Sequence, residues 1–259
     1  MSTLTGSSLT GKVAIITGGS KGTGLGIAKA YVKEGIAVAL TGRNADALEA
    51  AKAELEQLVP DARVLTLVAD NKDHAVPAQV VAQTVEAFGR LDVLINNAQE
   101  FRTGKSLLET TEDDMEATFE SGFFATWRYM AAAHPHLQAT EGTVINMSSG
   151  AGVQAVPGHS AYGPNKEAIR GLSRIAAKEW GTDKITVNSI SPYVASAESE
   201  RYEKAHPEII AEIMKGIALG RIGDAELNVG SLCVYLATEG GKYMTGANFD
   251  VDGGAFIRP

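Results

Sequence analysis

The stretch Thr17-Gly18-Gly19-Ser20-Lys21-Gly22-Thr23-Gly24 decides the fold of this chain. The apolar run Val13–Thr17 leads into it and predicts a strand, and the helical pattern Thr23–Glu34 follows at once. Glycine lets a pyrophosphate approach the backbone, and the first turn of a helix offers free N–H groups and a positive dipole end. This order predicts a dinucleotide-binding βαβ unit, although the glycines stand at 18, 22 and 24 and depart from the G-x-G-x-x-G spacing.

The same alternation of strand and helix patterns continues along the chain. The other predicted strands are Ala37–Thr41, Arg63–Val68, Leu91–Asn96, Thr143–Met147, Ile185–Ile190 and Asn248–Val251. The other predicted helices are Ala45–Leu58, Val76–Phe88, Asp113–His134, Ala161–Trp180 and Glu226–Ala237. The strand runs are apolar almost throughout, which is typical of parallel strands covered on both faces. The pattern therefore predicts an α/β fold of the doubly wound Rossmann type, with a seven-stranded parallel sheet flanked by helices on both faces.

The same reading places residues 1–259 in a single domain. Residues 1–8 are expected to form a flexible N-terminal tail. The stretch 191–220 shows no strand pattern and contains a predicted helix around Pro207–Lys215. Long insertions in compact domains often form lids or binding loops, so we expect a substrate-binding loop there.

Composition excludes several classes of protein. The 259 residues are 44% hydrophobic and 21% charged, which excludes a disordered chain. The chain has 23 basic and 31 acidic residues, which gives a net charge of −8. A negative protein repels the phosphate backbone, so the charge argues against nucleic-acid binding. The chain has no apolar run of the roughly 20 residues that a membrane span needs, and Met1–Thr10 is unlike a secretory signal, so a cytoplasmic location is expected. The single cysteine, Cys233, excludes a disulfide framework, and we expect no metal site.

The end of the second predicted strand indicates the type of cofactor. An NAD site usually has Asp or Glu about 20 residues beyond the glycines, to bond the ribose 2′-hydroxyl. Here Arg43 stands 19 residues beyond Gly24. Its forked, charged donors suit a 2′-phosphate, and Lys21 of the glycine loop is within reach of the same group. NADP(H) is therefore the predicted cofactor.

A second group of residues predicts proton transfer. Tyr162 and Lys166 are four residues apart, so they share one face of the predicted helix. Pro164 fits only in a first helical turn, which supports this placement. An ammonium near a phenol lowers the phenol pKa from about 10, which suits proton transfer near neutral pH. Ser149 follows the fifth predicted strand, at the edge of the sheet where ligands bind.

Together these motifs resemble the short-chain dehydrogenase/reductase family over Leu9–Gly254. The resemblance rests on the glycine loop, Asp70, Asn96-Asn97-Ala98, Ser149, Tyr162 and Lys166, and on the motifs Tyr243-Met244-Thr245-Gly246 and Val251-Asp252-Gly253-Gly254. The spacing between Ser149 and Tyr162, 13 residues, is the one that the family uses.

The resemblance implies a role for each matching residue. Tyr162 gives the proton to a carbonyl oxygen in reduction or takes it in oxidation, Lys166 bonds the nicotinamide ribose and lowers the tyrosine pKa, and Ser149 orients the carbonyl. Further implied cofactor contacts are Asn44, Asp70, Asn71, Asn97, Ala98, Pro192 and Val194. The resemblance also implies a homotetramer or homodimer that shares the helices Asp113–His134 and Ala161–Trp180.

The sequence departs from the family pattern near the expected active site. Gln99 replaces a glycine, Tyr193 replaces a glycine after Pro192, and Ala197 stands where a threonine is usual. The catalytic asparagine of the family falls at Gly122. Glycine keeps the main-chain carbonyl there and permits a distorted helix, so we expect a surviving water relay and reduced activity.

Gln99, Ser149, His159 and Tyr193 are the predicted substrate contacts. The predicted function is NADPH-dependent interconversion of a ketone or aldehyde and an alcohol. The substrate is expected to be a small uncharged carbonyl compound, or a 3-oxoacyl thioester. The alternative is a catalytically impaired NADP-binding sensor or scaffold. A nucleoside-binding methyltransferase is disfavoured by the phosphate-type loop and Arg43.

Overall fold

The computed structural model describes residues 9–194, 208 and 214–257. Within that part of the chain, seven strands form a parallel sheet in the order β3-β2-β1-β4-β5-β6-β7. They are β1 Val13–Ile16, β2 Ala37–Gly42, β3 Val64–Val68, β4 Val93–Asn96, β5 Thr143–Met147, β6 Thr186–Pro192 and β7 Asn248–Val251. The predicted Rossmann sheet is therefore confirmed. The strand order reverses between β1 and β4, which opens a crevice at their carboxyl ends.

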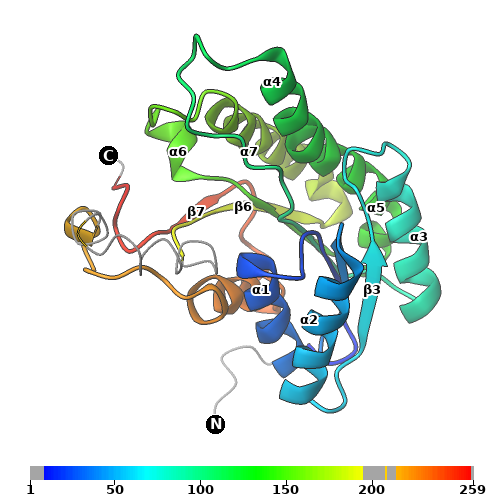
Figure 1. Cartoon of the computed structure of the whole chain (residues 1–259). Coiled ribbons are helices and arrows are strands. Elements are labelled where there is room, and N and C mark those ends of the chain that lie inside the picture. The colour runs from blue at the N-terminus through cyan, green and yellow to red at the C-terminus, as the bar shows by residue number, and fades with distance from the viewer. Residues whose placement is uncertain (1–8, 195–207, 209–213, 258–259) are drawn as a thin grey trace.

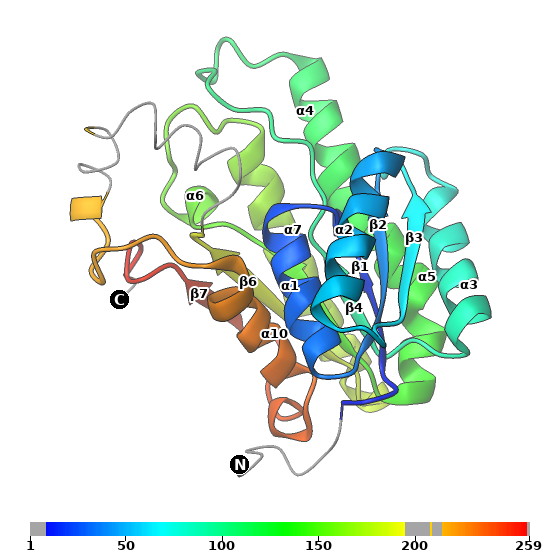
Figure 2. The ribbon, with the colours of Figure 1, turned by 60° about the horizontal axis from the view of Figure 1, so that its bottom comes forward.

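Two layers of helices cover the sheet (Figures 1 and 2). The helices are α1 Gly22–Lys33, α2 Ala45–Leu58, α3 Val76–Phe88, α4 Glu112–Phe119, α5 Ala125–Thr140, α6 Gly150–Val153, α7 Tyr162–Glu179 and α10 Ser231–Leu236. Buried side chains of α1, α2 and α10 pack on one face of the sheet, and those of α3, α5 and α7 pack on the other. Successive residues of a strand point to opposite faces. Ile16 therefore packs with α1, α2 and α10, and Ile15 packs with α3, α5 and α7.

Two predicted helices contain wider π-helical turns. The predicted helix Asp113–His134 is observed as α4 and α5, joined by the π turn η1 at Glu120–Phe124. The predicted helix Glu226–Ala237 begins with a second π turn, η3, at Ala225–Gly230. Gly26 of α1 lets η3 pack closely, because a Cβ there would lie 2.6 Å from the Cβ of Ala225. Such turns are local adjustments to packing, and periodicity alone does not reveal them.

The segment around 191–220 is only partly described. Strand β6 runs on to Pro192, two residues past its predicted end, because Ser191 and Pro192 pair with Asp250 and Val251 of β7. Val194 forms an isolated bridge with Gly223. The predicted N-terminal tail, Ala197 and most of the predicted helix Pro207–Lys215 lie outside the described residues. Among the helices that are described, none has both the length and the apolar character to cross a membrane.

Candidate active site

The glycine loop joins β1 to α1 in a shape that only glycine adopts easily. Gly18 has a φ of +65°, in the left-handed region that disfavours side chains. A Cβ at Gly24 would collide with the carbonyl oxygen of Gly18, so the first turn of α1 lies directly against the loop. The backbone is thus compact where a pyrophosphate would approach, as predicted for a dinucleotide loop.

The end of β4 holds this loop in place. The side-chain amide of Asn97 donates to the carbonyl oxygens of Thr17, at 2.9 Å, and Gly18, at 3.2 Å. The hydroxyl of Thr17 in turn accepts the backbone N–H groups of Asn97, at 2.9 Å, and Ala98, at 3.0 Å. Asn97 therefore fixes the glycine loop, a structural role that its predicted place beside a cofactor ribose did not include.

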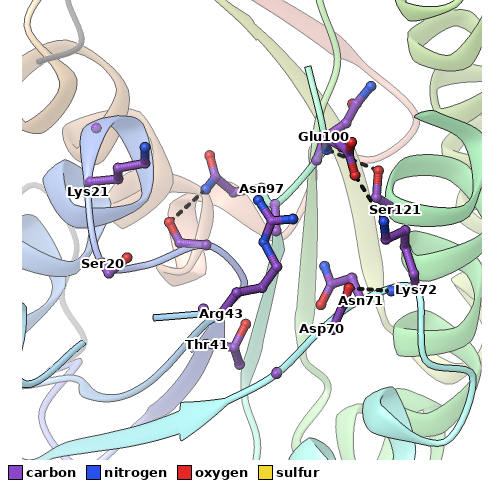
Figure 3. Close-up of a pocket in the computed structure, with 16 residues that line it drawn as sticks. Ser20, Lys21, Thr41, Arg43, Asp70, Asn71, Lys72, Asn97, Glu100 and Ser121 are labelled. Atoms are coloured by element: carbon purple, nitrogen blue, oxygen red, sulfur yellow. Dashed lines mark hydrogen bonds and ion pairs between the residues drawn. The ribbon is translucent and has the colours of Figure 1, made fainter. Parts of the chain in front are cut away.

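A pocket of about 330 Å³ opens beside the loop at the switch point of the sheet (Figure 3). Its lining includes ten predicted site residues: Gly18, Ser20, Lys21, Gly22, Arg43, Asp70, Asn71, Asn97, Ala98 and Gln99. Six lining residues were not predicted: Thr41, Gly42, Ala69, Lys72, Glu100 and Ser121. Thr23, Gly24 and Asn44 are not in the lining, and the Asn44 side chain instead caps α2 by accepting the N–H of Ala47 at 2.9 Å.

Three cationic and two acidic side chains line the pocket. Lys21 from the start of α1 and Arg43 from the end of β2 both line it, and the Arg43 side chain extends into it (Figure 3). Lys72 lines the opposite wall and pairs with Glu100 at 3.2 Å. Partial burial raises the pKa of Glu100, but hydrogen bonds from Arg102 and Lys72 outweigh it, so the net pKa lies below its ordinary value. The carboxylate therefore stays charged and holds Lys72 in the wall.

Gln99 lies in the wall of this pocket, although it was predicted to contact the substrate. Both polar atoms of its side-chain amide are buried, and neither has a hydrogen-bond partner among the residues described. Buried amides are nearly always hydrogen-bonded. Gln99 therefore lines the pocket, but its amide atoms are shielded from solvent and can pair with a bound molecule only if the side chain turns.

Tyr162, Ser149 and Lys166 come together at the carboxyl end of β5. Tyr162 is the first residue of α7, and Ser149 is the N-cap of α6, where its hydroxyl accepts the N–H of Ala151 at 3.2 Å. The Ser149 side chain also interacts with the Tyr162 phenol and acts to lower its pKa. The buried Lys166 amine lies 5.6 Å from the centre of the Tyr162 ring and donates to the carbonyl oxygen of Met147 at 2.6 Å. The one-face arrangement predicted from the spacing is thus present.

The electrostatics of this group differ from the prediction. Burial raises the pKa of Tyr162 above its usual 10, and the interaction with Ser149 only partly opposes this. Burial lowers the pKa of Lys166 from 10.5 to about 7. Burial disfavours both the phenolate and the charged amine, so it opposes the lowering of the tyrosine pKa that the spacing predicts.

Aromatic rings surround the Tyr162 phenol. Phe101, from the segment after β4, packs edge-to-face on Tyr162 with ring centres 4.8 Å apart. His159 lies close by, with its ring centre 5.9 Å from that of Tyr162. Phe101 is 63% exposed, so its ring also presents an apolar surface to solvent. His159 was a predicted contact, whereas Phe101 was missed because no motif marks it.

A second aromatic pair lies near Ser149. The ring of Tyr193, after β6, meets that of Phe256 edge-to-face at 6.1 Å. Phe256 packs on Gly150, the residue after Ser149, so closely that a Cβ at Gly150 would collide with the ring. Pro192 and Val194 lie at the same end of β6 but do not line the pocket described above.

Comparisons with known proteins agree with this geometry. Residues 18–255 match a family model described as enoyl-(acyl carrier protein) reductase. The 12alpha-hydroxysteroid dehydrogenase of a Clostridium species is 44% identical over 255 residues, which cover 96% of this chain and 98% of the relative. The 3-oxoacyl-[acyl-carrier-protein] reductase FabG of Chlamydia trachomatis is 32% identical and covers 95% of this chain and 98% of its own.

Solved structures agree as well. Levodione reductase superposes with a TM-score of 0.89 at 27% identity, covering 95% of this chain and 97% of that one. A short chain dehydrogenase from Burkholderia cenocepacia, solved in complex with NADP, superposes with a TM-score of 0.88 at 31% identity, covering 97% of this chain and 100% of that one. The chain therefore belongs to the short-chain dehydrogenase/reductase family of oxidoreductases.

Proposed function

We propose that this protein is an NADP(H)-dependent oxidoreductase that interconverts a ketone and a secondary alcohol. The observation that supports this most strongly is the Tyr162 phenol, which interacts with Ser149 and lies beside the Lys166 amine at the edge of the sheet. A phenol in this setting is a proton donor or acceptor for an oxygen bound next to Ser149. The pocket at the glycine loop is in the place where such a fold binds a dinucleotide.

The residues of the pocket fit an NADP molecule. The glycine loop and the first turn of α1 would hold the pyrophosphate, and Asp70 and Asn71 would border the adenine. Arg43 and Lys21 would hold a 2′-phosphate. An NAD site usually has an acidic residue in the place of Arg43, to bind the free 2′-hydroxyl of the ribose. We add Gln99 as a cofactor contact, because its unpaired amide lies in this wall.

The chemistry is divided between cofactor and protein. When bound, the nicotinamide supplies or accepts the hydride. Ser149 holds the substrate oxygen, and Tyr162 gives that oxygen a proton in reduction or removes one in oxidation. The neighbouring amine of Lys166 would hydrogen-bond the cofactor ribose, and in its charged form it would favour the phenolate.

We further propose a substrate with a rigid, mostly apolar skeleton, such as a hydroxysteroid or oxosteroid. Two features support this over an acyl thioester. The relative at 44% identity is named a 12alpha-hydroxysteroid dehydrogenase, whereas FabG is 32% identical. Phe101 and His159 give the approach to Tyr162 an aromatic wall, which suits a flat apolar ring system.

The test is a substrate panel with the purified protein. Absorbance of the reduced nicotinamide is followed with NADPH and NADH in turn, using 12-oxo and 3-oxo steroids, a simple cyclic ketone and a 3-oxoacyl thioester. We expect turnover of an oxosteroid with NADPH and far slower turnover with NADH. Tight NADPH binding without turnover of any carbonyl compound would favour a sensor or scaffold instead.

The same proposal covers assembly and the substrate loop. Trp127 of α5 and Ile175 of α7 are 51% and 58% exposed, which is unusual for large apolar side chains and fits a helical interface between copies of this chain. We therefore propose a homodimer or homotetramer of single-domain chains. The substrate-binding role of 191–220 stays a prediction, because much of that segment lies outside the described residues. Light scattering on the eluting protein measures the assembly, and a Trp127→Glu substitution is expected to reduce its size.

A further inference from the structure

The π turn η1 places Gly122 against helix α7. Gly122 is buried, and a Cβ built on it would lie 2.5 Å from Nδ2 and 2.8 Å from Oδ1 of Asn165. No Cβ atom tolerates such distances. The space in which a side chain at position 122 would lie is therefore filled by the side-chain amide of Asn165, which comes from the neighbouring helix.

Asn165 fixes the turn through one end of its amide. It is fully buried, and its Oδ1 accepts the backbone N–H of Phe123 at 2.9 Å. The other end, Nδ2, is buried and has no acceptor among the residues that the structure describes. A buried N–H donor without a protein partner requires an explanation, such as an ordered water or a role in the reaction.

The position of Asn165 on α7 links it to the site. Asn165 follows Tyr162 by three residues and directly precedes Lys166, so the three side chains share one side of the first turns of α7. Lys166 is itself buried and reaches the carbonyl oxygen of Met147. The unpaired N–H of Asn165 thus belongs to the residue of α7 that packs on η1 and directly precedes Lys166.

Building on the proposed function, we propose that Asn165 is a positioning residue for Lys166 and replaces the asparagine side chain that position 122 lacks. Its Oδ1 holds η1 open, and its Nδ2 donates to a water that hydrogen-bonds the Lys166 amine. In each reduction, Tyr162 gives its proton to the substrate oxygen, and solvent returns a proton to the phenolate through this water and Lys166. The amide of Asn165, from α7, thus lies where a side chain at position 122 of η1 would lie.

An exchange of side chains tests this. The wild type is compared with Asn165→Ala, Gly122→Asn and the double variant that carries both. We expect each single variant to lower kcat by about 10–100-fold, because the amide is lost or the two amides collide. The double variant should recover at least tenfold over the worse single variant, because one amide again occupies the space. Affinity for NADPH, measured by fluorescence, should stay unchanged in Asn165→Ala.

A second variant separates a purely structural role from the proposed one. Asn165→Asp keeps the size of the side chain and the acceptor for Phe123 but has no N–H to donate. We expect it to lower kcat and to shift the pH profile of kcat with KM unchanged. A wild-type kcat and pH profile in either Asn165→Asp or Asn165→Ala, or a double variant no better than the worse single one, would overturn the proposal.

Activity of the wild type distinguishes a failure of the proposed function from a failure of the inference about Asn165. If the wild type turns over no carbonyl compound, the proposed function fails, and the place of Asn165 is judged from thermal unfolding. Gly122→Asn should lower Tm by about 5 °C, and addition of Asn165→Ala should restore most of that loss. If Gly122→Asn melts like the wild type, the two side chains do not compete for one space, and the inference is wrong.

Discussion

Burial of Lys166 makes the stability of this protein depend on pH in a direction that can be worked out. The folded chain lowers the pKa of Lys166 from 10.5 to about 7, whereas the unfolded chain restores the ordinary value. Between these two values unfolding takes up a proton, so raising the pH opposes unfolding. This contribution to stability therefore grows from pH 7 upward and levels off near the unfolded pKa. Below the folded pKa both states are protonated, and the penalty for burying the charge is constant.

The size of the effect follows from the same two pKa values. Each unit of pKa difference corresponds to about 1.4 kcal/mol, and at pH 7 the folded amine is half protonated. Between pH 7 and pH 9 the free energy of unfolding should therefore rise by about 2 kcal/mol from this residue alone. Lys166→Met keeps an unbranched side chain one atom shorter and removes the titrating amine, so the variant should lack this increase.

Urea unfolding measures this in the protein without cofactor. Fluorescence of the two tryptophans reports the transition at a fixed protein concentration, in buffers from pH 6 to pH 9. The matched control is Lys178→Met, which removes an exposed lysine of the same helix and should follow the wild-type pH dependence. If the wild type and Lys166→Met show parallel pH profiles, Lys166 keeps its ordinary pKa and the account of the site is wrong.

Three further predictions concern the cofactor pocket. Gly24→Ala should destabilise the fold by about 1–3 kcal/mol in chemical unfolding and abolish NADPH binding, because the added Cβ collides with Gly18. The control is Gly171→Ala, at a helical glycine with open space around it, which should instead raise stability by up to about 1 kcal/mol. Arg43→Asp should weaken NADPH binding about 10–100-fold with little loss for NADH, and equal losses for both in steady-state kinetics would refute the assignment of Arg43 to the 2′-phosphate. Gln99→Leu should weaken NADPH binding about tenfold in titration calorimetry, because the proposed amide contact is lost. Its Tm should stay the same or rise, because two unpaired buried polar atoms are removed. Unchanged affinity would show that the amide does not contact the cofactor.

Much of the fold could be predicted because local pattern and tertiary structure agree here. The strands of a parallel sheet covered on both faces are short apolar runs, and Val13–Ile16 is buried at every position, as its composition suggests. The glycine loop was predictable because the conformation of Gly18 and the contact at Gly24 restrict those positions to glycine. Ser149, Tyr162 and Lys166 were found because their spacing places them at one strand end and on one helix face.

Other features depend on contacts that no local pattern records. The π turn at Gly122 packs against Asn165, 43 residues later in the chain, and although a distorted helix was expected at Gly122, nothing in the sequence marked Asn165 as its neighbour. Phe101 and Phe256 reach the site from loops whose course is set by tertiary packing. Gln99 is a similar case. It follows β4, and the course of the chain after that strand, which the sequence does not show, places Gln99 in the wall of the cofactor pocket.

The pKa of Tyr162 shows where spacing alone misleads. The interval between Tyr162 and Lys166 correctly placed an amine beside the phenol, but it did not show that both groups are buried. Burial raises the pKa of the phenol and lowers that of the amine, and both shifts oppose the electrostatic effect expected from the pair.

The most direct test of the central claim is hydride transfer in Tyr162→Phe. A single turnover of pre-bound NADPH with an oxosteroid that the wild type reduces isolates the chemical step from product release. The account predicts unchanged affinity for NADPH and a hydride-transfer rate lower by about 10²–10⁴-fold, because phenylalanine keeps the contact with Phe101 but has no proton to give. A rate equal to that of the wild type would contradict the assignment of the proton to Tyr162, and with it the proposed chemistry of the site.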